Sequence, residues 1–149
     1  MAIQRFENGP RMSRVVVHGD TVYLAGLTAE KTVGSSLAEQ TQEILARIDG
    51  LLAVGGTDKS KLLQATIWLQ DIRTVDEFNK VWDAWVVASQ APARACIEAR
   101  LQSPAKRSRS RSPPRGRPTF AIDALIVPDA RSGTKPRSEG GRHVSRITP

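Results

Sequence analysis

Two kinds of hydrophobic periodicity alternate along this chain, and the alternation restricts it to few folds. Runs with the two-residue period of strands lie at residues 14–17, 21–27, 62–69 and 92–101. Apolar stripes with helical spacing follow Ser36 and Thr74. The resulting order, β-β-α-β-α-β, predicts an α+β protein in which two helices cover one face of a sheet.

Local signals mark where these elements begin and end. Gly19-Asp20 predicts a tight turn between the first two strands. Ser36 and Thr74 each stand three residues before a glutamate, which is the spacing of a helix capping box. Gly55-Gly56 supplies a residue free to take positive φ where the first helix should end, and the second helix should run to about Ala88.

The strand between the two helices should be buried on one face. Its alternation predicts a core face made of Leu63, Ala65, Ile67 and Leu69. The second helix carries three aromatic side chains at helical spacing, and we expect them in the core or between subunits: Phe78, Trp82 and Trp85.

Charge divides the chain, because the net charge of +7 resides entirely in the last third. Residues 1–104 carry eleven Lys/Arg and twelve Asp/Glu, a net charge of −1, whereas residues 105–149 carry eleven and three, a net charge of +8. Residues 105–118 are rich in Arg, Ser and Pro and have too little apolar surface to offset the entropy of ordering them. We expect an insertion or linker there, a candidate last strand at residues 119–128 and a disordered basic tail at residues 129–149.

Length and composition exclude several classes of protein. The 149 residues suit one domain, and no apolar run approaches the roughly 20 residues of a membrane helix. The N-terminus lacks the order of a secretory signal, and a single cysteine forms no intramolecular disulfide. We therefore expect a cytoplasmic protein without a membrane segment. No metal-ligand residue types show useful spacing, so we expect neither metal nor cofactor.

The run at residues 92–101 combines a polar face with an apolar one. Alternation places Arg94, Cys96, Glu98 and Arg100 on one face, and Ala95, Ile97, Ala99 and Leu101 on the other. We expect the apolar face in the core. Because ionised groups are unfavourable to bury without partners, the polar face should meet a ligand or a partner subunit.

Several motifs in a fixed order carry a family resemblance. They are Gly9-Pro10, residues 22–26, residues 40–45, Asp71-Ile72, the Asn-x-x-aromatic-x-x-aromatic pattern of residues 79–85, and Pro92-Ala93-Arg94-Ala95-Cys96-Ile97-Glu98. Through them the chain from about Ile3 to Pro104 resembles the reactive-intermediate deaminase family, also called RidA or YjgF, which is endoribonuclease L-PSP-like. The resemblance implies a chorismate-mutase-like α+β fold and a homotrimer with ligand pockets between subunits.

The resemblance also implies an activity, the hydrolysis of 2-imino or enamine acids to 2-keto acids and ammonia. In that scheme the guanidinium of Arg94 binds the substrate carboxylate, and Asn79 and the backbone near Cys96 line the cleft. An acid positions or deprotonates the attacking water. Asp123 is the candidate for this acid, because its neighbours resemble the family's last strand.

The chain departs from the family pattern at two places. Arg11 follows Gly9-Pro10 where classical deaminases carry an aromatic residue, so the pocket should differ. The position expected for the family's acid falls inside residues 105–118. Either this segment is an insertion between two strands, or the sequence after about Pro104 is a frame-shifted tail, in which case the sheet lacks a central strand.

Other roles compete for the remaining features. Cys96 has the character of a small buried residue more than of a nucleophile, and Glu98 that of an ion-pair partner. The six Lys/Arg of residues 105–118 favour weak, nonspecific nucleic-acid binding. The alternative function is therefore a non-enzymatic trimer that binds a ligand or RNA, as ribonuclease-like or translation-inhibitor-like members of the family do.

Overall fold

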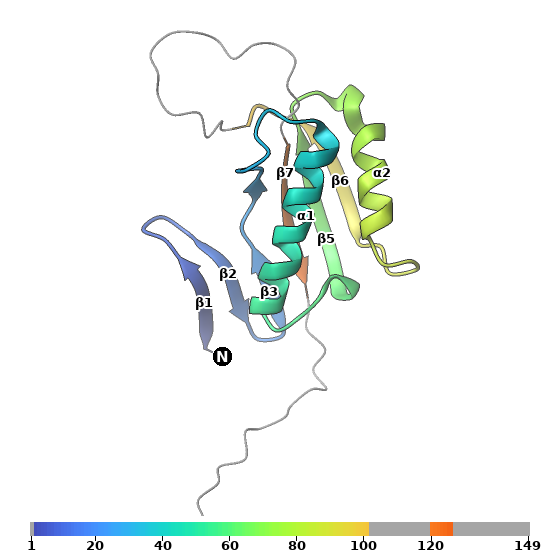
Figure 1. Ribbon diagram of the computed structural model, residues 1–149. Helices are drawn as coiled ribbons and strands as arrows, with labels where there is room; N and C mark the ends of the chain where they lie inside the picture. Colours follow the sequence, from blue (N-terminus) through green and yellow to red (C-terminus); the bar gives the residue numbers. More distant parts are fainter. Residues whose placement is uncertain (1, 102–119, 127–149) are drawn as a thin grey trace, which may run out of the picture.

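Two helices lie across the same face of one sheet in the computed structural model of the chain, which describes residues 2–101 and 120–126 (Figure 1). The strands are β1 (Ile3–Asn8), β2 (Ser13–His18), β3 (Thr21–Leu24), β4 (Leu27–Thr28), β5 (Leu62–Leu69), β6 (Ala93–Glu98) and β7 (Phe120–Ile126). The helices are α1 (Leu37–Val54) and α2 (Val75–Trp85), and single 3₁₀ turns lie at Lys59–Lys61 and Ile72–Thr74. The α+β architecture predicted from the sequence is confirmed.

The last strand of the described residues, β7, lies in the middle of the sheet. The strand order is β1-β2-β3-β7-β5-β6, and β4 also pairs with β7. β5 and β6 run parallel and are connected through α2, whereas the remaining pairs are antiparallel. β7 therefore joins the N-terminal hairpins to the β5-α2-β6 unit.

Two consecutive hairpins form the N-terminal part of the sheet. The predicted turn is confirmed, because His18 pairs with Thr21 and Gly19, between them, takes a φ of 58°. β1 was not predicted. Its side chains are mostly exposed, with Phe6 partly buried, so the strand lacks the apolar alternation from which strands are recognised.

Both predicted ends of α1 are confirmed. The Ser36 hydroxyl accepts the backbone N–H of Glu39, and the Glu39 carboxylate accepts the backbone N–H of Ser36, which completes the capping box. At the other end Gly56 takes a φ of 78°. The N–H of Thr57 then reaches the carbonyl of Leu52 at 2.9 Å, and the helix ends in a Schellman turn.

The predicted core face of β5 is correct except at its first residue. Ala65, Ile67 and Leu69 are buried, but Leu63 is 48% exposed and its neighbour Leu62 is buried instead. The pairing of β5 with β7 shifts between Leu62 and Gln64, which is a β-bulge. Because a bulge adds one residue to one strand, it exchanges the faces on either side, and simple alternation fails there.

The second predicted capping box is wrong. The Thr74 side chain makes no cap to α2, and its hydroxyl donates to the carbonyl of Asp71 at 2.7 Å. The Asp71 carboxylate caps the preceding turn, Ile72–Thr74. The polar residues that were predicted to start the helix therefore belong to this turn. α2 ends at Trp85, earlier than predicted.

The expected faces of β6 are inverted. Ile97 is 46% exposed on the side of the sheet away from the helices, whereas Cys96 is half-buried and packs against the core. The guanidinium of Arg94 lies over two rings of α2. The apolar side of β6 is therefore exposed, and the polar side lies under α2. Because β6 is an edge strand, the long side chain of Arg94 can lie beside the helix and keep its charged end in solvent.

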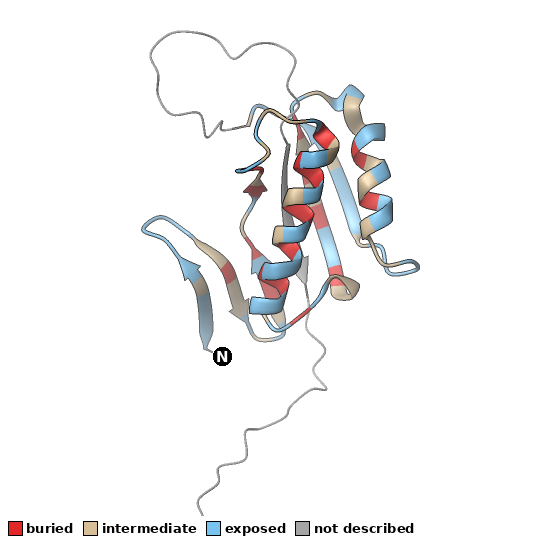
Figure 2. Cartoon of the chain, in the orientation of Figure 1, coloured by how far each residue is buried: buried red, intermediate tan, exposed pale blue. Residues whose placement is uncertain are grey.

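The hydrophobic core lies between the helices and the sheet, where the inward sides of α1 and α2 are buried (Figure 2). From α1 it receives Leu37, Ile44, Leu45, Ile48, Leu51 and Leu52, and from α2 Phe78 and Trp82. The helices among the described residues are too short or too polar to span a membrane.

Candidate functional site

The polar side of β6 brings Arg94 against the aromatic residues of α2. The Cζ atom of Arg94 lies 5.5 Å from the centre of the Trp82 ring and 5.9 Å from that of Phe78. Both rings are buried, while Arg94 itself is exposed. The guanidinium therefore sits at the rim between β6 and α2, with aromatic rings on one side and solvent on the other.

The charge of Arg94 is not balanced by a carboxylate from residues 2–101. The ion pairs among residues 2–101 join Arg14, Arg47 and Arg73 to nearby acids, and none includes Arg94. An arginine held at a rim without an anionic partner is suited to bind a carboxylate from a ligand with two parallel hydrogen bonds.

Asn79 follows Phe78 in α2 and has an unusual side chain. Its Oδ1 atom is buried and has no hydrogen-bond partner among the described residues. Leaving a buried carbonyl oxygen unpaired costs about 1–3 kcal/mol. A polar atom left in this state has an unused capacity to accept a hydrogen bond.

Cys96 lies two residues after Arg94 on the same side of β6. Burial raises the pKa of its thiol, and the positive charge of Arg94 and the N–H of Ile97 offset only part of this effect. Because the thiolate is the reactive form, a thiol with a raised pKa is a poor nucleophile at neutral pH. Cys96 can line a cleft but is not activated.

The Glu98 carboxylate has a structural role. Its Oε2 atom accepts the backbone N–H of Ile72 at 3.0 Å. This bond joins the end of β6 to the turn before α2. Among the described residues of this single chain it forms no ion pair within 4.0 Å, and an ion pair across a subunit interface stays a prediction.

Asp123 is separated from Arg94 within the sheet. In β7 the backbone of Asp123 is paired with Thr66, whereas in β6 Arg94 is paired with Ala65. β5 lies between the two strands, so their backbones are about 10 Å apart. Their pairing partners in β5 are successive residues, and successive residues of a strand belong to opposite faces of a sheet. Within one copy of the chain, the register does not bring Arg94 and Asp123 together.

A strongly held carboxylate, that of Glu43, lies elsewhere and is structural. Glu43 of α1 accepts the backbone N–H groups of Glu30, Lys31 and Thr32, and the Thr32 hydroxyl at 2.6 Å. Burial opposes its ionisation, but these hydrogen bonds prevail and lower the pKa of Glu43 to about 2. A carboxylate with its oxygens occupied in this way fixes the loop before α1 and is unsuited to act as a base.

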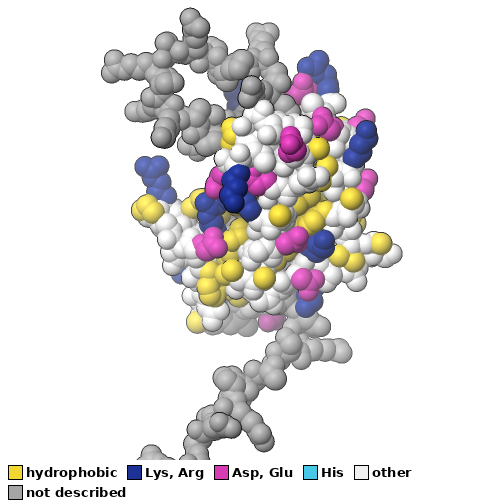
Figure 3. Space-filling view, in the orientation of Figure 1, with side chains coloured by type: hydrophobic (Ala, Val, Ile, Leu, Met, Phe, Trp, Pro, Cys, Tyr) yellow, Lys and Arg dark blue, Asp and Glu magenta, His cyan; other side chains and the backbone are white. Residues whose placement is uncertain are grey.

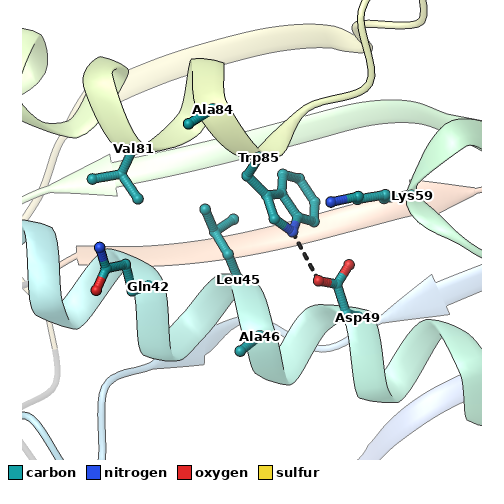
Figure 4. A pocket seen from close by; sticks show the side chains of 8 residues that line it. All are labelled: Gln42, Leu45, Ala46, Asp49, Lys59, Val81, Ala84 and Trp85. Atoms are coloured by element: carbon teal, nitrogen blue, oxygen red, sulfur yellow. Dashed lines mark hydrogen bonds between the residues drawn. The ribbon is translucent and has the colours of Figure 1, made fainter.

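A cleft of about 300 Å³ between α1 and α2 contains none of the predicted site residues (Figure 4). Across it the indole N–H of Trp85 donates to Asp49 at 3.0 Å, and the ammonium of Lys59 lies 5.2 Å from the Trp85 ring centre. Trp85, Asp49 and Lys59 interact with one another, and the hydrogen bond from Trp85 to Asp49 links α2 to α1. A second cleft, of about 410 Å³, is lined by Arg14 and Arg47 with acidic partners and is neutralised by its own ion pairs.

Two further properties of the described residues concern metal ligands and surface charge. Within residues 2–101 and 120–126, no group of three His, Cys, Asp or Glu side chains is arranged to hold a metal ion. On the helix side, basic and acidic side chains are interspersed and form no continuous basic surface (Figure 3). The arrangement around Arg94 is an exposed guanidinium at a rim with aromatic surroundings.

Sequence analysis missed the residues that support Arg94. Phe78 and Trp82 were predicted as core or subunit packing, and their contact with the guanidinium was not foreseen. Their spacing of four residues puts them on one side of α2, and α2 is the crossover between β5 and β6. A crossover helix covers the strand it leads to, so this signal was available in the sequence.

Comparisons with known proteins identify the family of the chain. The sequence model of the family described as endoribonuclease L-PSP matches residues 3–106. A RutC family protein of Haemophilus influenzae is 41% identical over 104 residues, which cover 70% of this chain and 90% of the relative. The RutC family protein YoaB of Escherichia coli K12 has the same identity and coverage.

Solved structures show the same fold. A YjgF family member from Neisseria meningitidis superposes with a TM-score of 0.74 at 38% identity, over 87% of this chain and 97% of that one. A protein from Pseudomonas aeruginosa superposes with a TM-score of 0.73 at 31% identity, over 86% and 100%. The chain belongs to the endoribonuclease L-PSP family, the family of the RutC and YjgF proteins.

Proposed function

We propose that the chain is a hydrolase that deaminates reactive 2-imino or enamine acids to 2-keto acids and ammonia. One observation carries the proposal. The guanidinium of Arg94 is held at an accessible rim, has buried rings behind it, and has no carboxylate partner among the described residues. A carboxylate on the substrate supplies the missing partner.

The reaction needs little besides position and electrostatics. Two hydrogen bonds from Arg94 to the substrate carboxylate fix the neighbouring imine carbon for attack. Water adds to that carbon and gives up a proton, and a carbinolamine forms. The C–N bond then breaks as a proton reaches the nitrogen, and ammonia leaves the 2-keto acid. An enamine enters the same sequence after protonation at carbon.

The other residues of the site have supporting roles in the proposal. The unpaired Oδ1 atom of Asn79 accepts an N–H from the imine nitrogen. Cys96 and its backbone line the cleft, with the thiol neutral. Asp123 positions the water from a neighbouring copy in a homotrimer, because the sheet register separates it from Arg94 within one copy.

We also propose that residues 1–104 and 119–128 form one domain, interrupted by residues 105–118 and followed by a basic tail at residues 129–149. The position of β7 between β3 and β5 supports this division, as does the end of the family match at residue 106. Limited proteolysis should cut first within residues 105–118 and leave both fragments associated, whereas release of the C-terminal fragment would contradict the proposal. The composition suits a cytoplasmic location.

The test of the activity uses imines generated in situ by an amino-acid oxidase. The chain should accelerate release of ammonia and keto acid, and Arg94→Ala should lower kcat/KM by roughly a hundredfold or more, because two charged hydrogen bonds are lost. Arg100→Ala is the matched control, since this exposed arginine lies just beyond β6. Asp123→Asn should lower kcat with little effect on KM.

Equal rates for the unaltered chain and Arg94→Ala would sink the hydrolase mechanism. The alternative is a non-enzymatic trimer that binds a ligand or RNA. The family description and the six Lys/Arg of residues 105–118 favour it. A salt-dependent affinity for single-stranded RNA that is lost on deleting residues 105–118, without imine hydrolysis, would select this alternative.

A further inference from the structure

We propose that Trp82 is a positioning residue, whose indole face orients the guanidinium of Arg94 for the substrate carboxylate. The inference rests on the proposed function, and it adds a specificity element at the same site. Trp82 does not touch the substrate in this scheme, because it is 4% exposed and lies behind Arg94.

The contact between the two residues has the geometry of a cation–π interaction. The 5.5 Å from the Arg94 Cζ atom to the Trp82 ring centre lies within the roughly 6 Å over which such pairs attract. Tryptophan gives the strongest interaction of this kind among the aromatic side chains. Phe78 contributes a second ring at 5.9 Å, so the guanidinium is attracted by two rings on neighbouring turns of α2.

Trp82 is itself held firmly. Its ring lies 5.9 Å from that of Phe78 and 5.4 Å from that of Trp85. The Trp85 indole N–H in turn donates to Asp49 of α1 at 3.0 Å. A row of contacts therefore runs from α1 through the aromatic side chains of α2 to Arg94, and the guanidinium rests on a rigid surface.

Arg94 needs such support more than an average arginine. β6 lies at the edge of the sheet, and Arg94 makes no ion pair among the described residues that would fix its long side chain. An unrestrained arginine loses rotamer entropy when it is ordered by a ligand. A cation–π contact occupies none of the guanidinium N–H groups with an oxygen acceptor, so these donors stay available to a carboxylate. The ring therefore orders Arg94 before the substrate arrives.

The experiment compares Trp82→Leu with Trp82→Phe in the full chain. Leucine keeps an apolar side chain but lacks a π face, whereas phenylalanine keeps the π face. Trp82→Leu should raise the KM for the 2-imino acid, and the dissociation constant of a 2-keto acid measured by calorimetry, by about tenfold. Trp82→Phe should stay within about threefold of the unaltered chain, and kcat should change less than KM in both.

A structural role for Trp82 predicts a different pattern. In the Arg94→Ala background, Trp82→Leu should cause no further rise in KM, because the interaction is already absent. A further tenfold rise in that background would overturn the inference, and so would unchanged KM and keto-acid affinity in Trp82→Leu. If Arg94→Ala itself has no effect on hydrolysis, the proposed function fails, which is a different outcome from failure at Trp82 alone.

A second measurement avoids any change in packing. Site-specific replacement of Trp82 by tryptophans with an increasing number of fluorine atoms weakens the ring quadrupole while the shape of the side chain is nearly preserved. The keto-acid dissociation constant should rise stepwise with fluorination. An affinity independent of fluorination would show that Trp82 acts through its shape alone, and the inference would be wrong.

Discussion

The two faces of the sheet differ in how their apolar residues are used. On the covered face, Ile67 and Val22 are fully buried under the helices. On the open face, Ile97 of β6 and Tyr23 of β3 are each 46% exposed in the single chain. The open face is therefore apolar without being the core, and the polar side of β6 faces the helices.

This difference shows that an apolar strand face is not necessarily the face that the helices cover. Exposed apolar groups gathered on a sheet are typical of a surface that meets another protein. The homotrimer of our proposal supplies such a cover, since a closed symmetric assembly uses the same patch on every copy. The covered face then stabilises the chain, and the open face stabilises the assembly.

The sharpest test of the covered face uses two leucines of the same strand. Leu69 is 1% exposed and Leu63 is 48% exposed, although simple alternation predicts both in the core. Leu69→Ala should lower the free energy of unfolding by about 2–5 kcal/mol, because it leaves a cavity. Leu63→Ala should lower it by no more than about 0.5 kcal/mol. Urea denaturation followed by circular dichroism gives both values, and equal losses would show that the bulge in β5 is absent.

The open face is tested by placing a charge on it. Ile97→Asp should convert a homotrimer to monomers, because a carboxylate is strongly disfavoured in an apolar interface. Val33→Asp is the control, since Val33 is 50% exposed in the loop before α1 and lies off the sheet. The measurement is mass in solution by light scattering. An unchanged mass for Ile97→Asp would mean that no copy of the chain covers this face.

The sequence predicted the elements that carry strong local signals. The capping box at Ser36 and the turn at Gly19 act through neighbouring backbone groups, so their structure follows from nearby residues alone. β1 and the bulge at Leu63 depend on pairing with distant strands, and local periodicity does not contain that information.

The candidate site was predictable only in part, for the same reason. The motif singles out Arg94, but the register between β5, β6 and β7 decides that Asp123 is not beside it. The face on which Arg94 lies depends on where α2 crosses, which is a tertiary property. Strand alternation separates the two faces of β6 correctly and leaves open which of them is covered.

The smallest effect concerns Cys96, which shares β6 with Ile97 but lies on the covered side. Because burial raises the pKa of the thiol, less thiolate is present at any pH below it, and alkylation at pH 8 should be several-fold slower than in the urea-unfolded chain. Arg94→Ala should slow it further, since the positive charge of Arg94 lowers this pKa, and Arg100→Ala should not. The alkylation rate measured against pH gives the pKa directly. An inflection at that of a free thiol that Arg94→Ala leaves unchanged would contradict the burial of Cys96 beside Arg94 on the covered side of β6.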